Sequence, residues 1–271
     1  MISNNTLDDA NRGNSKAIKF KDITTVKELL EYLNNPFDNK QWSYAYHYTN
    51  LYTLFQIYNN KSFRLSQMIK MNDVLEFRFA RGCKNYYFCL ARGRKNNKEN
   101  FGMWAMYGHI KNKKTNKENI IDYAKQIGVK IEFQRETLKK IVSLNTNLKF
   151  HFVAYTNLIN KESKMKIKCG STSTKERIEI NRSLHGYLKD NSWEYEKEMR
   201  LCFPSGLNTQ NNYIDIQLNN DNDKNILKEL VVFPSPLYSV QECEIVFKQL
   251  SKDNNIITPH FCENKYFSTF Q

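Results

Sequence analysis

The sequence lacks any apolar run of the length that a membrane span requires, and residues 1–20 contain no apolar signal core. We therefore expect a cytoplasmic chain with no membrane partner. It also lacks a close Cys-x-x-Cys pair, because its six cysteines are scattered, which argues against a zinc site or a disulfide framework. No internal repeat or long linker divides the chain. We expect an N-terminal arm and helix over residues 1–40 and a single domain over residues 41–271.

Acidic residues are few relative to basic ones: 28 Asp and Glu against 41 Lys and Arg leave a formal net charge of +13. Such an excess raises the affinity for polyanions, so nucleic acid or an anionic cofactor is an expected partner. The basic residues gather in two stretches, residues 92–117 and 161–168. An AT-rich coding sequence explains any single lysine equally well, so only the two stretches together indicate nucleic acid.

Hydrophobic periodicity predicts short strands that alternate with helices, which is an α+β chain with mostly antiparallel strands. Thr25 and Glu28 form a capping box that opens a helix ending at Asn34, and residues 1–18 form a polar, mobile arm. The expected strands are 44–50, 63–66, 86–91, 128–133, 150–155, 193–203, 213–218, 230–233 and 256–260. The expected helices follow Asn50, Asp73 and Ser239 and cover 101–108, 135–144 and 175–188, with a polar connection at 156–175.

An acidic stretch at residues 193–203 stands out from these elements. In an extended strand, one face carries four charged side chains: Glu194, Glu196, Glu198 and Arg200. Neighbouring carboxylates repel and raise each other's pKa unless a cation or a ligand relieves them. The stretch therefore indicates a site, although the solvated face of an edge strand or of an amphipathic helix gives the same pattern.

Several short motifs occur in a defined order over about residues 44–260. They are Tyr46-His47-Tyr48-Thr49, Met71-Asn72-Asp73 with Glu76, Met103-Trp104 with Tyr107, residues 128–133, and Trp193-x-x-Glu196-x-Glu198-x-Arg200. This order resembles a large bacterial family of uncharacterised domains. The same order is similar to the ADP-ribosyltransferase superfamily of the His-Tyr-Glu kind, to which the DarT-type toxins belong. The resemblance implies a split antiparallel sheet with interspersed helices that binds NAD as a substrate.

The resemblance also implies roles for individual residues. His47 matches the histidine of the first strand, Glu198 matches the catalytic glutamate, and Glu196 stands where the acceptor is oriented. Trp104 or Tyr107 matches the aromatic residue that stacks on nicotinamide. The remaining residues that we assign to NAD binding are Tyr48, Thr49, Arg64 and Asn72, and no metal is expected. The loop at Asn72 and Asp73 has no counterpart in the toxins.

The chemistry of the implied reaction suits these residue types. Breaking the bond between nicotinamide and ribose creates an oxocarbenium-like sugar, which a carboxylate stabilises where water is excluded. An aromatic face orients the planar leaving group. Arg64, Arg78 or Arg200 is suited to the pyrophosphate.

Each of these residues also has an alternative interpretation in which its role is only structural. His47 then forms only a structural hydrogen bond, Trp104 and Tyr107 belong to the core, and Arg200 pairs with Glu196 or Glu198. Asn72 and Asp73 then form an Asx turn that caps the following helix.

The sequence leads to one main hypothesis and two alternatives. The main hypothesis is an NAD-dependent ADP-ribosyltransferase that modifies nucleic acid, with RNA favoured over DNA because unstacked strands expose base edges. Such an enzyme is expected to be a bacterial toxin or phage-defence effector held in check by an inhibitory antitoxin protein. One alternative is a metal-dependent nuclease that uses Asp73, Glu76, Glu196 and Glu198. The other is a non-catalytic RNA-binding module.

Overall fold

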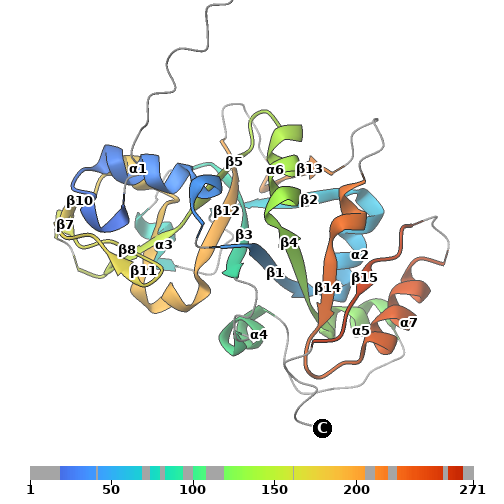
Figure 1. Cartoon of the computed structure of the whole chain (residues 1–271). Helices are drawn as coiled ribbons and strands as arrows, with labels where there is room; N and C mark the ends of the chain where they lie inside the picture. Colours follow the sequence, from blue (N-terminus) through green and yellow to red (C-terminus); the bar gives the residue numbers. More distant parts are fainter. Residues whose placement is uncertain are drawn as a thin grey trace, which may run out of the picture.

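The computed structural model describes residues 19–40, 42–68, 74–79, 83–93, 100–107, 119–160, 162–204, 211–218, 225–252 and 256–264 (Figure 1). The α-helices are α1 (Val26–Asn34), α2 (Leu51–Asn60), α3 (Val74–Phe79), α4 (Phe101–Tyr107), α5 (Ile120–Gln126), α6 (Arg135–Leu144) and α7 (Val240–Leu250). Short 3-10 helices are η1 (Phe20–Asp22), η2 (Pro36–Asp38), η4 (Arg182–Leu184), η5 (Asn191–Glu196) and η6 (Ile226–Glu229). None of the described helices is long and apolar enough to cross a membrane.

The strands are mostly short. They are β1 (Tyr44–Asn50), β2 (Ser62–Gln67), β3 (Tyr86–Gly93), β4 (Gly128–Gln134), β5 (Lys149–Phe152), β6 (Ala154–Thr156), β7 (Lys164–Met165), β8 (Lys168–Cys169), β9 (Thr172–Ser173), β10 (Ile178–Glu179), β11 (Leu188–Asp190), β12 (Glu198–Phe203), β13 (Tyr213–Gln217), β14 (Val231–Pro234) and β15 (His260–Phe261). The main sheet has the order β13-β2-β3-β1-β4-β14-β15, and β12 pairs with both β3 and β5. Within this sheet the pairs are antiparallel except β14 with β15, so the prediction of an α+β chain with mostly antiparallel strands is confirmed.

The main sheet opens along one edge of β3. Strand β12 pairs with the opposite edge of β3 from Tyr86 to Ala91. On the open edge, β1 pairs with β3 only at residues 91–93, and β2 pairs with it only at residues 86–87. Strand β1 stays with β4 along its whole length, so it leaves β3 after Tyr46. Neither neighbour is paired with β3 at residues 88–90, which leaves a gap in the sheet.

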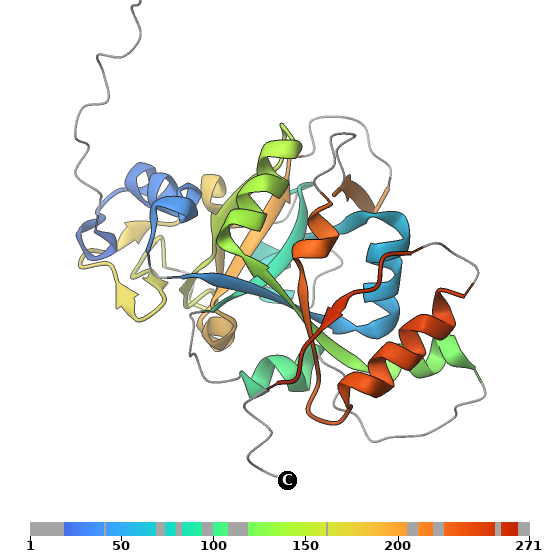
Figure 2. The ribbon, with the colours of Figure 1, turned by 45° about the vertical axis from the view of Figure 1, so that its right-hand side comes forward.

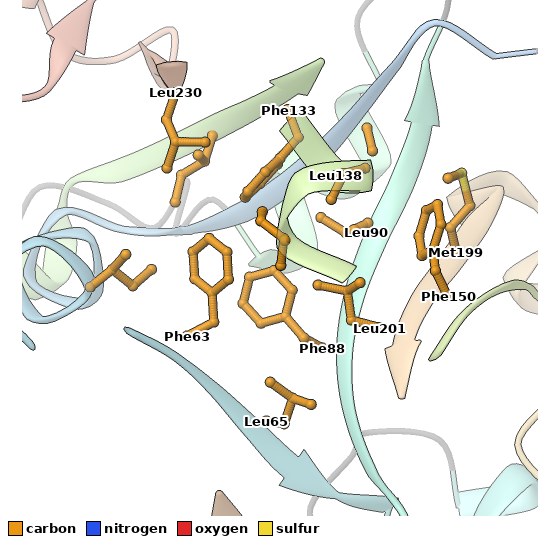
Figure 3. Close-up of a cluster of buried hydrophobic side chains, with 14 of the residues drawn as sticks. Phe63, Leu65, Phe88, Leu90, Phe133, Leu138, Phe150, Met199, Leu201 and Leu230 are labelled. Carbon is orange, nitrogen blue, oxygen red and sulfur yellow. The ribbon is translucent and has the colours of Figure 1, made fainter. Parts of the chain in front are cut away.

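Side chains of the hydrophobic core pack beside this gap. The rings of Phe63 and Phe88 stack at 4.8 Å, and Phe133 of β4 meets Phe63 edge-on (Figure 3). Further out, α2, α5 and α7 pack together on one side of the sheet (Figure 2). At the opposite end of the sheet, α1 packs on β5 and places Leu29 and Leu33 in the same core. The division at residue 40 stays a prediction.

Local signals predicted most of these elements correctly. The Thr25 capping box is present, Asn50 caps α2, and Ser239 caps α7. Several predictions differ from the structure. The expected helix over 175–188 is replaced by β10, η4 and β11, because β10 pairs with β7 and β11 pairs with β6; Gly186, with a positive φ of 82°, turns the chain before β11. The connection at 156–175 contains β7, β8 and β9. The last strand begins at His260 rather than at residue 256.

The acidic stretch is only partly a strand. Residues 191–196 form η5, and Lys197 then adopts a left-handed conformation with φ of 46°. Only residues 198–203 are extended, as β12. The 3-10 turn therefore sends Glu194 to the surface, where its side chain pairs with Lys168, while Glu196 and Glu198 are buried.

Candidate functional site

A pocket of about 670 Å³ lies where β1 and β2 separate along β3. One end is lined by charged and aromatic side chains: Glu76, Tyr107, Lys189, Trp193, Glu196 and Glu198. The middle is lined by His47, Tyr48, Phe88, Cys89 and Leu90. The other end is lined by polar residues of α2, β2 and β13: Thr53, Gln56, Asn60, Ser62, Arg64, Ser66 and Asp215. A volume of this size falls in the usual range for sites that bind small molecules and cofactors.

His47 is the first residue of β1 beyond its last pair with β3. Its Nδ1 lies 2.9 Å from the carbonyl oxygen of Cys89, and its ring stacks on Phe88 at 4.1 Å. Because a carbonyl only accepts, Nδ1 carries the proton and Nε2 is the acceptor of the neutral ring. Burial lowers the pKa of His47 to about 4, so the ring is neutral at pH 7.

Glu198 is the first residue of β12, and both of its carboxylate oxygens are held. Arg200 Nε donates to Oε1 at 2.7 Å, and Lys189 Nζ donates to Oε2 at 3.0 Å. Its backbone N–H donates to the hydroxyl of Tyr155 at 2.7 Å. Burial alone opposes ionisation, yet Arg200 and Lys189 outweigh it and hold the pKa of Glu198 well below its usual range.

Glu196 ends η5 and faces the same lysine. Lys189 Nζ lies 2.5 Å from its Oε2, and the Tyr107 hydroxyl donates to its Oε1 at 2.7 Å. Burial and the charge of Glu198 raise the pKa of Glu196 above its usual value. Two neighbouring carboxylates therefore have pKa values shifted in opposite directions.

Arg200 ties this pair to α3. Its guanidinium forms a two-pronged ion pair with Glu76, with Nη2 at 2.8 Å from Oε2, and Nη1 also donates to the carbonyl of Gly186 at 3.1 Å. The side chains of Arg200 and Glu76 are 0% and 1% exposed. Burial raises the pKa of Glu76. Arg200 is thus a partner of Glu198, as the structural interpretation of the sequence proposed.

The charges at this end do not cancel. Three carboxylates (Glu76, Glu196 and Glu198) face two cations (Lys189 and Arg200), which leaves one negative charge when all five are ionised. A buried negative charge favours a ligand that carries or develops positive charge. In a chain with a net charge of +13, this is a local reversal of sign.

At the opposite end of the pocket, the charged side chains are more exposed, so water weakens their interaction. Arg64 forms a forked pair with Asp215 at 3.0 and 3.2 Å and lies over the ring of Tyr213 at 3.9 Å. This pair uses Nε and Nη2 of Arg64. Its Nη1 is outside the pair, so Arg64 can hold Asp215 and still donate to a ligand.

The structure brings together many, though not all, of the sequence-predicted residues. His47, Tyr48, Arg64, Tyr107, Glu196 and Glu198 line the pocket. Trp104 does not: it is completely buried and packs edge-on against Tyr48. Thr49 is also buried outside the lining. Asn72 and Asp73 lie outside the described residues.

Sequence reasoning missed Lys189. It directly follows the expected helix over 175–188, whereas it is the middle residue of β11, which pairs in parallel with β6. No sequence signal separates it from the other lysines, because its role depends on a strand pairing between distant segments.

The nuclease hypothesis meets an obstacle in the same geometry. It requires a divalent cation among Asp73, Glu76, Glu196 and Glu198. The last three form ion pairs with Lys189 or Arg200, and these cations occupy the positions that a divalent cation would need. In the part of the chain that the structure describes, no three His, Cys, Asp or Glu side chains are arranged to hold a metal ion.

Comparisons with known proteins add little to this geometry. No family model and no curated protein matches the sequence. Among solved structures, the chain is similar to DarT of Thermus sp. 2.9 in complex with NAD+, with 13% sequence identity over 84% of this chain and 98% of that chain. The TM-score of 0.36 is too low to define a shared fold.

Proposed function

We propose that this protein is an NAD-dependent ADP-ribosyltransferase that modifies nucleic acid. The observation that supports it is the meeting of His47, from β1, with Glu198, from β12, in one pocket with the phenol of Tyr107. These two strands pair with opposite edges of β3, and the side chains of both residues line the same pocket.

The electrostatics of the pocket suit the cleavage of nicotinamide from ribose. The sugar becomes positively charged as the bond breaks, and the net negative charge at the Glu198 end stabilises it. Because Arg200 and Lys189 keep Glu198 ionised, its carboxylate is an acceptor for a ribose hydroxyl at neutral pH. Glu196, with its raised pKa, is suited to orient or deprotonate the acceptor.

The middle of the pocket is assigned to the rest of the dinucleotide. Neutral His47 offers Nε2 to a ribose hydroxyl, and Tyr107 provides an aromatic face for nicotinamide. Tyr48 contributes surface beside it, with Trp104 as its support rather than as a ligand contact. Arg64 is placed for the pyrophosphate.

Nucleic acid is the proposed acceptor because of the net charge of +13. RNA is favoured over DNA, since unpaired bases are more accessible in single strands. Much of the basic stretch at 92–117 lies outside the described residues, whereas residues 162–168 are described and carry exposed lysines. A cytoplasmic toxin or phage-defence role with an inhibitory antitoxin protein completes the proposal.

The test is incubation of the purified protein with adenosine-labelled NAD and separate pools of RNA, DNA and protein. We expect release of nicotinamide and label in nucleic acid. Glu198→Gln should slow the reaction by about 100- to 1000-fold, as loss of a preorganised electrostatic contact does. Glu194→Gln is the matched control, because Glu194 belongs to the same acidic stretch but pairs with Lys168 at the surface.

Two outcomes would refute the proposal in different ways. No consumption of NAD by the wild type would refute the transferase. Label in protein alone would refute only the nucleic-acid target. Thermal unfolding of each variant shows whether a loss of activity is a loss of fold.

A further inference from the structure

Lys189 is the only cation that contacts both Glu196 and Glu198 among the described residues. Its Nζ lies 2.5 Å from one carboxylate and 3.0 Å from the other, and its side chain is 5% exposed. Arg200, the other buried cation, contacts Glu198 and Glu76 instead. Lys189 therefore joins the two halves of the acidic pair, and it lines the pocket beside them.

Two carboxylates that share one ammonium group lie close to each other. Without the cation, their mutual repulsion and their burial favour the uptake of a proton by one of them. Tyr107 donates to Glu196, which helps it stay ionised but adds no charge. The net charge at this end of the pocket would change from one negative to two if Lys189 were neutral.

We propose that Lys189 is a positioning residue that keeps Glu196 and Glu198 ionised together and fixes their spacing for the reaction. This inference rests on the proposed function, since it concerns how the same site works. Lys189 acts through the two carboxylates and takes no direct part in bond breaking.

The other titratable groups around Glu196 and Glu198 do not supply the positive charge of Lys189. Those that face the pair from the packed elements are Glu76 of α3, Cys89 of β3, Tyr107 of α4, His151 of β5, Tyr155 of β6, Tyr195 of η5 and Arg200 of β12; burial keeps His151 neutral at pH 7. Of these, only Arg200 is positively charged, and Glu76 and Glu198 already hold it. When the lysine charge is removed, Glu196 should therefore take up a proton before Glu198 does, because the pKa of Glu196 is already raised.

The experiment compares Lys189→Met, Lys189→Gln and Lys189→Arg with the wild type. The measured quantity is kcat/KM for nicotinamide release as a function of pH. In the Met and Gln variants, the acidic limb of this pH profile should move up by about 1 to 3 pH units, which is the pKa shift that one nearby opposite charge produces. The Arg variant, which keeps the charge, should return the limb toward its wild-type position.

Lys140→Met is the matched control. Lys140 also lies 2.5 Å from a glutamate, Glu229, but the two side chains are 42% and 33% exposed. Its removal should leave the pH profile unchanged. A uniform loss of activity at all pH values in the Lys189 variants, with no shift of the limb, would overturn the inference and leave Lys189 a structural residue.

A second measurement does not depend on activity. Infrared difference spectra at neutral pH count protonated buried carboxyl groups, and Lys189→Met or Lys189→Gln should show one more than the wild type. If the wild type consumes no NAD, the proposed function fails, and these spectra still decide the charge role of Lys189. An unchanged carboxyl signal in both folded variants would overturn it. If Met unfolds the chain, the Gln variant, which keeps a hydrogen-bond donor, is the one measured.

Discussion

Replacement of Arg200 by Met tests whether the buried charges at the end of the pocket depend on each other. The guanidinium is 0% exposed and donates to Glu76, Glu198 and the carbonyl of Gly186. Met keeps most of the stem volume but removes the charge, so two buried carboxylates lose their main partner. Breaking a buried ion pair in this way costs about 3 to 5 kcal/mol.

Arg64→Met is the matched control for this change. Arg64 also forms a forked pair with a carboxylate, that of Asp215, at 3.0 and 3.2 Å. Its side chain is 54% exposed and that of Asp215 is 34% exposed, so water already solvates both. Exposed pairs contribute about 0 to 1 kcal/mol, so Arg64→Met should change the free energy of unfolding by no more than that.

The assay is urea unfolding at pH 7, with the midpoint and slope of each transition. We expect Arg200→Met to lower the free energy of unfolding strongly and Arg64→Met to lower it only slightly. The double variant Glu76→Gln/Arg200→Met should recover part of the loss, because it buries one unpaired charge fewer than Arg200→Met. If Arg200→Met lowers the free energy of unfolding no more than Arg64→Met does, burial does not determine how much the ion pairs of Arg200 with Glu76 and Glu198 stabilise the fold, and the reasoning is refuted.

Three further predictions concern single side chains. Tyr107→Phe keeps the ring but removes the hydrogen bond to Glu196. A hydrogen bond to a charged group contributes roughly 1.5 to 3 kcal/mol, and the lower end of that range corresponds to a fall of about tenfold in the rate of nicotinamide release. An unchanged rate would contradict this prediction. Burial lowers the pKa of His151 to about 4, below the value of 6.5 in the unfolded chain, so stability present above pH 6.5 is lost as the pH falls to 4, by up to about 3 kcal/mol. His151→Gln should flatten that slope in urea midpoints measured across the range, and an equal slope in both proteins would refute the assignment. Gly186→Ala should lower the unfolding temperature, because φ is 82° and the new Cβ would lie 2.1 Å from the Tyr87 hydroxyl; a stable Ala variant would show that this turn can adjust.

The sequence by itself determined the features that depend on neighbouring residues. The capping box at Thr25 and the cap at Asn50 are local hydrogen bonds, and both are present. The aromatic and small residues at 44–50 and the alternation at 128–133 predicted two strands, and the structure pairs them along their full length. The row of carboxylates at residues 193–203 indicated Glu198 as a candidate, and the resemblance of the motif order indicated His47.

The tertiary structure decided which of these residues meet. The aromatic spacing of α4 fits both Trp104 and Tyr107, but only the packing of α4 against β1 buries the first and leaves the second in the pocket. A left-handed residue at Lys197 broke the expected strand and turned Glu196 toward Lys189. Lys189 and Glu76 join the site through strand pairing and helix packing between segments far apart in the chain. Contacts of this kind are set by the whole fold, because no local propensity specifies which distant charges will share one buried space.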